Sequence, residues 1–162
     1  MPISHHEGCG CKHADEVLRG GEFLLKYMDV EKVTALNEQV PGSCRKILKH
    51  YDDRLSPSNC ESDADHELIM NIPFTSPCKI VSLFLIGGEE GSYPKKIKIY
   101  SNREDIDFEN IHDFKCVQEL DLSEDYHGSV EYPLKVYEAS PNLSDHKVKG
   151  AENKMHFSFD AF

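Results

Sequence analysis

From Leu68 onward, apolar and polar positions alternate along the chain with the period expected of β-strands. Residues 95–102, KKIKIYSN, place Ile97 and Ile99 on one face of a strand and the intervening lysine on the other. Residues 129–136, SVEYPLKV, repeat the alternation with larger apolar side chains. Short strands separated by Gly-, Pro- and Asp-containing turns predict an all-β fold, an antiparallel β-sandwich or jelly roll.

Other segments refine this expectation. Residues 79–87, KIVSLFLIG, are apolar on both faces and predict a central strand covered on two sides, whereas Pro73 and Pro133 favour a strand end or a sheet edge. Asp29 is a candidate N-cap for a short helical turn. Residues 37–60 have the composition of a surface connection, and residues 137–162 return to a loop-like composition.

The length of 162 residues suits one domain. Residues 1–21, rich in His, Gly and Cys, predict a flexible tail; residues 22–148 hold the β-domain, and residues 149–162 are expected to form a C-terminal tail. We expect the protein to be a monomer.

The charge pattern limits the class of partner. Eighteen basic and 29 acidic residues give a net charge of −11, which disfavours nucleic acid and anionic membranes and favours a protein surface of basic or mixed charge. Neither a secretory signal nor an apolar run long enough to cross a bilayer is present, so the expected location is cytoplasmic, with nuclear access. In that compartment we expect no disulfide among the six cysteines, Cys9, Cys11, Cys44, Cys60, Cys78 and Cys116.

The segment ESDADHELIMNIPF, residues 61–74, runs from clustered carboxylates into apolar residues. On a strand, Asp63, Asp65 and Glu67 would share one face and could bind a hard cation such as calcium. An EF-hand loop is excluded, because the positions that need glycine and a bidentate glutamate hold Leu68 and Phe74. The simpler interpretation is a solvated turn at the entrance to a strand, available to another protein. The predicted partner-binding residues are Glu61, Asp63, Asp65 and Glu67.

Sequence motifs for catalysis are absent: there is no G-x-S-x-G, H-E-x-x-H, P-loop or dinucleotide fingerprint, and no Cys-x-x-Cys. The N-terminal residues His5, His6, Cys9, Cys11 and His13 include metal-binding side chains, but no second spaced pair follows them. We therefore predict a protein that is not an enzyme and that has no cofactor and no catalytic or structural metal.

The same ESDAD…NIPF segment resembles the signature of the PITH domain, which is named for its interaction with the proteasome. LNE at residues 36–38, KIYSN at residues 98–102 and YEASPNLSDHKV at residues 137–148 support the resemblance to stand-alone PITH domain-containing proteins. The resemblance implies a galactose-binding-like β-sandwich of jelly-roll type. It also implies a non-enzymatic interaction domain that associates with the 26S proteasome, at subunits of its regulatory particle.

Compared with that family, the chain lacks a late segment where Val136 runs directly into Tyr137, so the resemblance implies an incomplete sandwich that arises from an alternative isoform or a gene-model error. Two other functions stay open. One is a jelly-roll module that binds a carbohydrate or calcium, although the chain has no tryptophan for a sugar platform. The other is a regulatory adaptor in gene expression or differentiation.

Overall fold

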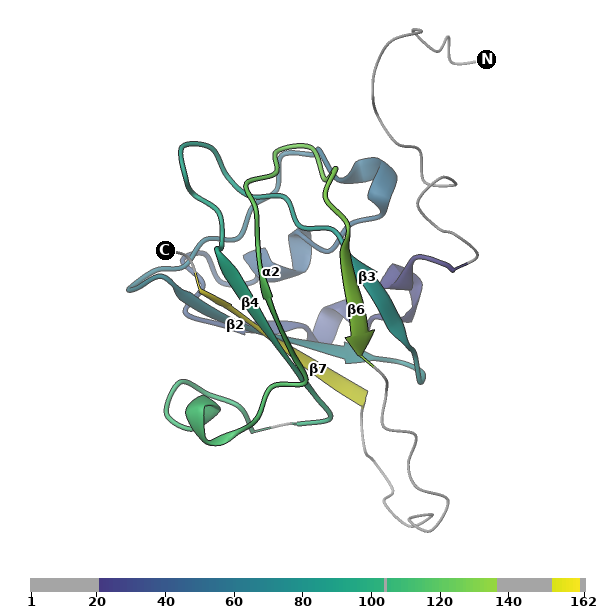
Figure 1. The fold of residues 1–162 in the computed structure, drawn as a ribbon, viewed down its shortest axis with the longest axis vertical. Coiled ribbons are helices and arrows are strands. Elements are labelled where there is room, and N and C mark those ends of the chain that lie inside the picture. Colours follow the sequence, from purple (N-terminus) through teal and green to yellow (C-terminus); the bar gives the residue numbers. More distant parts are fainter. Residues whose placement is uncertain (1–20, 104, 137–152, 161–162) are drawn as a thin grey trace, which may run out of the picture.

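The computed structural model describes residues 21–103 and 105–136, together with the backbone of 153–160 (Figure 1). Strands dominate it, and the helices are single short turns. The order along the chain is η1 (Leu24–Tyr27), η2 (Val30–Lys32), β1 (Thr34–Leu36), α2 (Ser43–Lys46), η3 (Tyr51–Asp53), β2 (Glu67–Phe74), β3 (Ile80–Leu83), β4 (Lys96–Ser101), η4 (Ile111–Asp113), β5 (Gln118–Asp121), β6 (Tyr132–Val136) and β7 (Asn153–Asp160).

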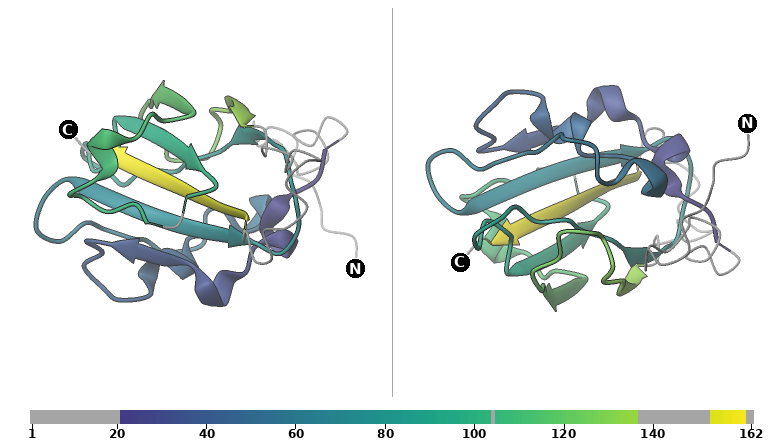
Figure 2. Two further views of the ribbon diagram at one scale, coloured as in Figure 1. Left: turned by 90° about the horizontal axis from the view of Figure 1, so that it is seen from below. Right: turned by 90° about the horizontal axis from the view of Figure 1, so that it is seen from above.

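Five strands form one sheet in the order β1-β2-β7-β4-β5, and every neighbouring pair is antiparallel. Strand β7, the last along the chain, therefore lies at the centre of the sheet. It pairs with β2 from Glu67 to Phe74 on one side and with β4 from Lys96 to Ser101 on the other. Both views in Figure 2 show β2 and β7 side by side.

Strands β3 and β6 form a second, two-stranded antiparallel sheet. Its buried side chains share one hydrophobic core with the inward-facing side chains of the large sheet. Ile97 and Ile99 of β4 and Val136 of β6 are completely buried in this core. The burial of apolar area between the two sheets supplies the main stabilising free energy of the fold.

The opposite face of the large sheet is covered by the segment of residues 105–116, which contains η4. Ile106 and Ile111 from this segment are buried against Ile69 of β2 and Tyr100 of β4. Ile69 lies in β2 between two residues of the main core, so its side chain faces the other side of the sheet, as the period of a strand requires.

The alternation read from the sequence is confirmed in two strands. Ile97 and Ile99 of β4 are fully buried, whereas Lys96 and Lys98, which alternate with them, are more exposed. In β6 burial alternates residue by residue from Tyr132 to Val136. The all-β class that this pattern predicted is observed.

The prediction of a central strand over residues 79–87 is wrong. Only Ile80–Leu83 forms a strand, β3, and it has a single partner, β6. Val81 is 53% exposed. Phe84 follows the strand and is apolar for a different reason. Its ring packs edge-on against the ring of Tyr51, with ring centroids 5.0 Å apart. An apolar loop that packs against an aromatic ring has the same sequence pattern as a strand that is buried on both faces.

Pro73 is the last residue but one of β2, close to the strand end that the sequence predicted, and it pairs with β7 on one side of the strand. Strand β1 pairs only with Ile69–Asn71 and stops short of Pro73. There the Pro73 carbonyl accepts a hydrogen bond from the Asp29 backbone N–H (2.9 Å). The proline nitrogen faces the same side, beyond the end of β1, so the ladder between β1 and β2 requires no N–H at this position.

Two segments expected to be loops contain ordered structure. The structure forms β7 over Asn153–Asp160, where the composition predicted loop and a C-terminal tail over 149–162. Short β-segments with Asn, Lys and Ser are hard to separate from loops by composition, and their pairing partners decide the outcome. Within the connection 37–60, Ser43, Cys44 and Tyr51 are buried. The predicted N-terminal tail lies outside the described residues, apart from Gly21.

Asp29 occupies the N-cap position of η2, as predicted, but its side chain makes no capping hydrogen bond. No disulfide joins the four cysteines in the described part of the chain, Cys44, Cys60, Cys78 and Cys116. Cys9 and Cys11 lie outside the described residues. Among the helices that the structure describes, none combines the length and the apolar character needed to span a bilayer.

Candidate functional site

The acidic segment of residues 61–67 forms an ordered turn that leads into β2, and Asn37 organises it. The Asn37 side-chain nitrogen donates to the Asp65 carboxylate (2.8 Å) and to the Glu67 carbonyl (2.7 Å), and its side-chain oxygen accepts from the Ala64 N–H (3.0 Å). Its backbone φ of 69° lies in the left-handed region, which asparagine tolerates better than most residues. One side chain therefore fixes the path of the acidic turn.

The four predicted carboxylates have different environments. Glu61, Asp63 and Glu67 are exposed, and the Glu61 carboxylate accepts a hydrogen bond from Asn59. One Asp65 oxygen accepts from both Asn37 and the Glu67 N–H (3.0 Å), so Asp65 helps to form the turn. The structure thus brings all four residues together on one segment, with Asp65 in a supporting position.

The neighbouring residue, Glu38, ties this turn to α2. Its carboxylate accepts hydrogen bonds from the Gly42 N–H (2.7 Å), the Cys44 N–H (3.0 Å) and the Ser43 hydroxyl (3.2 Å). Its backbone forms a bridge with Ser62 at the start of the acidic segment. Burial opposes ionisation of Glu38, but these hydrogen bonds outweigh it and hold the pKa of its carboxyl below the usual value.

The thiols beside Glu38 are unsuited to nucleophilic chemistry. Burial, together with a hydrogen bond to Glu38 and its negative charge, raises the pKa of Cys44 to about 12. Burial also raises the pKa of Cys60, whose thiol bonds with Ser43. Because the thiolate is the reactive form of cysteine, both residues stay protonated at neutral pH and act as packing groups.

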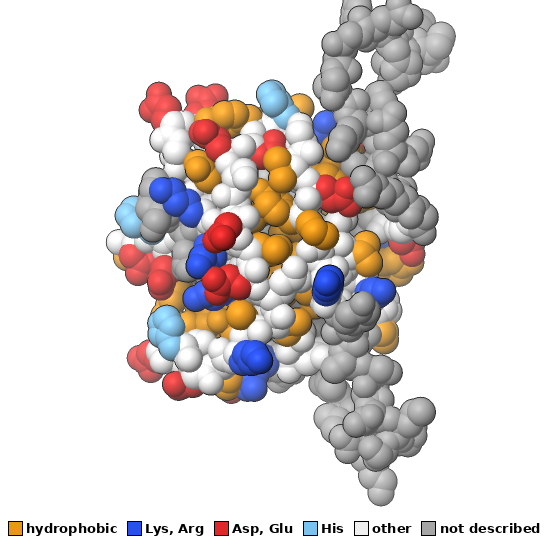
Figure 3. Space-filling model, viewed as in Figure 1, with side chains coloured by type: hydrophobic (Ala, Val, Ile, Leu, Met, Phe, Trp, Pro, Cys, Tyr) orange, Lys and Arg blue, Asp and Glu red, His pale blue; other side chains and the backbone are white. Residues whose placement is uncertain are grey.

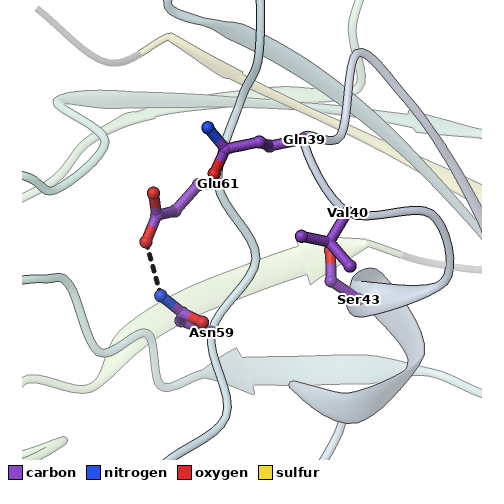
Figure 4. Close-up of a pocket in the computed structure, with 5 residues that line it drawn as sticks. All are labelled: Gln39, Val40, Ser43, Asn59 and Glu61. Atoms are coloured by element: carbon purple, nitrogen blue, oxygen red, sulfur yellow. Dashed lines mark hydrogen bonds between the residues drawn. The ribbon is translucent and has the colours of Figure 1, made fainter.

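A shallow depression lies between α2 and the acidic segment (Figure 4). It is lined by Gln39, Val40, Ser43, Asn59 and Glu61, and its empty volume of about 200 Å³ opens to solvent. Pockets that enclose small molecules shield most of the ligand surface from solvent. Val40 is 57% exposed at its rim. The depression suits a single side chain of a partner better than an enclosed ligand.

Carboxylates, thiols and imidazoles do not gather into a cation site in the part of the chain that the structure describes: no group of three or more His, Cys, Asp or Glu residues is placed to hold a metal. The histidines and cysteines of the N-terminal cluster, at positions 5–13, lie outside that part. On the face shown in Figure 3, acidic and basic side chains are interspersed with apolar ones.

Comparison with known proteins gives the family. Residues 14–140 match the PITH domain. The chain belongs to the PITH domain family. It is 42% identical over 137 residues to a PITH domain-containing protein of Caenorhabditis elegans, and 33% identical over 138 residues to PITH domain-containing protein 1 of Homo sapiens. Each alignment covers 81% of this chain, but only 64% of the worm protein and 65% of the human protein.

This PITH domain thus spans less than two thirds of the length of those two relatives. The family match ends at residue 140, before β7 begins at Asn153. The acidic segment, Asn37 and Glu38 all lie inside the matched region.

Sequence reasoning did not assign roles to Asn37 and Glu38, although the LNE motif contributed to the resemblance. An asparagine followed by a glutamate, just ahead of a Pro-Gly turn, gives a weak local signal for a left-handed residue and a carboxylate acceptor. The partners of the Asn37 side chain lie 27 to 30 residues away in the chain. Such long-range hydrogen bonds cannot be found from local patterns.

Proposed function

We propose that this PITH domain is a non-enzymatic protein-interaction module that binds the proteasome regulatory particle through its acidic segment. The observation that carries the proposal is the pre-formed turn that presents the exposed carboxylates of Glu61, Asp63 and Glu67. Because this turn is already ordered before a partner binds, less conformational entropy is lost on binding. The carboxylates fit a partner surface rich in Lys and Arg, with association that weakens as salt increases. We also propose that the protein is located in the cytoplasm and in the nucleus.

We also propose that the fold is of the galactose-binding-like jelly-roll type. Two antiparallel sheets that share one core support this assignment. A surface function fits this arrangement, because the depression beside the acidic segment is small and open.

Charge reversal at the exposed positions tests the interaction. We expect Glu61→Lys combined with Asp63→Lys to reduce recovery of proteasome subunits from cell extract at least tenfold, because each reversal turns an attraction into a repulsion. The reversal should change the free energy of unfolding by less than about 0.5 kcal/mol, since both side chains are exposed. Subunits would be quantified by mass spectrometry after capture on the purified protein.

Glu109→Lys combined with Asp113→Lys, two exposed reversals in the segment that covers the opposite face of the large sheet, is the control matched in charge and should leave recovery unchanged. Asn37→Ala separates structure from contact: it removes no charge but releases the acidic turn, and should lower both stability and recovery. Undiminished recovery with the folded Glu61→Lys/Asp63→Lys variant would refute the proposed surface.

A further inference from the structure

The dipeptide Ser-Pro occurs in this chain at residues 56–57, 76–77 and 140–141. Proline after a serine is the recognition feature of proline-directed protein kinases, because its ring and missing N–H distinguish it from every other residue. The first two sites lie in the described structure and differ strongly in their surroundings. The third lies outside the described residues.

The site at Ser56 lies on an exposed loop. Ser56 and Pro57 are both exposed, and the preceding residue, Leu55, is 56% exposed. The loop is held by local bonds: the Ser56 N–H donates to the Asp53 carbonyl (2.9 Å), and the Ser58 N–H donates to the Ser56 carbonyl (2.8 Å). Surface loops with few buried contacts open at low free-energy cost, so an enzyme cleft can engage this segment without unfolding the domain.

The site at Ser76 is constrained. Ser76 lies two residues after the end of β2 at Phe74, and it is only partly exposed. The adjoining Thr75 is bound through both its N–H (2.7 Å) and its hydroxyl (3.1 Å) to the carbonyl of Tyr27. Cys78, two residues on, packs against the main core. Presenting Ser76 to a kinase would require the end of β2 to detach.

The side-chain ammonium group of Lys49 lies beside Ser56. The Lys49 ammonium group donates to the Ser56 carbonyl and to the Ser58 carbonyl (3.3 Å). A phosphoryl group on the Ser56 hydroxyl would bring a charge of about −1.5 to −2 close to this ammonium group and offer it stronger acceptors than two carbonyls. Asp52 and Asp53 in the preceding η3 carry negative charges that would repel the phosphoryl group, and the positive charge of Lys49 would offset this repulsion.

We propose that Ser56 is a phosphorylation site for a proline-directed serine/threonine kinase, and that Lys49 binds the phosphate. The kinase transfers the γ-phosphoryl group of ATP to the Ser56 hydroxyl oxygen. The bond from that phosphorus to ADP breaks, ADP leaves, and the hydroxyl proton passes to the kinase. The proposal concerns a different segment from the acidic turn and does not depend on the proposed function.

The test is phosphorylation of the folded chain with a purified proline-directed kinase and Mg-ATP, followed by intact mass and site mapping. We expect incorporation at Ser56 that is abolished in Ser56→Ala and unchanged in Ser76→Ala. The heat-unfolded chain, in which both sites are accessible, should also accept phosphate at Ser76. Failure of the folded chain to accept phosphate at Ser56, or equal labelling of Ser56 and Ser76 in it, would overturn the assignment.

The role of Lys49 is tested by the change in melting temperature on phosphorylation, compared between the parent chain and Lys49→Gln. We expect the phosphorylated parent to melt at least about 1 °C higher, relative to its unmodified form, than the phosphorylated variant does relative to its own. An equal change in the two proteins would show that Lys49 does not bind the phosphate.

Discussion

Asp125 is a buried carboxylate, 6% exposed, at the start of the loop that leads to β6. Its two oxygens accept hydrogen bonds from the His127 N–H (3.0 Å) and the Val130 N–H (2.9 Å). Its own carbonyl accepts from Gly87 (3.1 Å), so this residue also joins two loops. Burial opposes ionisation, but the backbone donors outweigh it and hold the pKa of Asp125 below its usual value.

This geometry predicts acid sensitivity. A carboxyl whose pKa is lowered in the folded state adds stability above the unfolded-state pKa, near 4, and that stability is lost as the pH falls through the folded-state pKa. We expect Asp125→Asn to lower the free energy of unfolding by about 1–3 kcal/mol at pH 7, because bonds to a charged acceptor are lost. Urea unfolding between about pH 7 and pH 3 measures both proteins.

The decisive observation is the difference between the two curves. The stability gap between parent and Asp125→Asn should begin to narrow below about pH 4, where the carboxyl of the unfolded chain takes up a proton while that of the folded chain is still ionised. A stability gap that stays constant down to about pH 3 would show that ionisation of Asp125 adds no free energy of unfolding.

At the scale of elements, the side chain of Gln118 links the two sheets. From β5 of the large sheet, its amide nitrogen donates to the Pro133 carbonyl (3.1 Å), and its amide oxygen accepts from the Lys135 N–H (2.9 Å) in β6. A side-chain amide presents the same donor and acceptor as a peptide group. Gln118 thus substitutes for a neighbouring strand at the edge of β6 and leaves that edge less open to other chains.

Gln118→Ala should remove both bonds and lower the free energy of unfolding by about 1–2 kcal/mol. It should also increase aggregation on heating, because the edge of β6 becomes available for pairing. Chemical denaturation and light scattering measure the two effects. Glu119→Gln, the adjacent residue on the other face of β5, loses only the charge of an exposed pair with Lys96 and should change stability by less than about 0.5 kcal/mol. Equal losses in the two variants would contradict the bridging role.

The sequence was informative where one strand face is buried and the other is not. Strands β4 and β6 could be found because Ile97, Ile99 and Val136 alternate with polar residues. Strand β3 was overestimated, since an apolar loop residue such as Phe84 cannot be distinguished from a strand residue by composition. The acidic segment was found, but Asn37, which shapes it, was not, because its bonds cross a long stretch of chain.

At the scale of the whole molecule, the central position of β7 has the largest effect. Without it the large sheet would divide into β1-β2 and β4-β5, because β7 supplies every ladder contact between them. Both halves would then expose an unpaired strand edge that was previously at the centre of the sheet.

Deletion of residues 153–162 should therefore abolish cooperative thermal unfolding and produce aggregates, observed by calorimetry and size-exclusion chromatography. The peptide NKMHFSFD, residues 153–160, added in excess should restore a cooperative transition by pairing between β2 and β4. A soluble deletion variant that melts at the parent temperature would show that β7 is dispensable.

The order of the strands in the sheet also bears on how the protein is made. All other described strands leave the ribosome before β7, so neither half of the large sheet can be completed while the chain is still growing. From the synthesis of β5 until β7 emerges, the nascent chain must carry two half-sheets that cannot yet pair through β7, a state prone to misassociation with neighbouring polypeptides. Its yield in a cell will therefore depend on chaperone supply and on translation speed more than the stability of the finished domain would suggest.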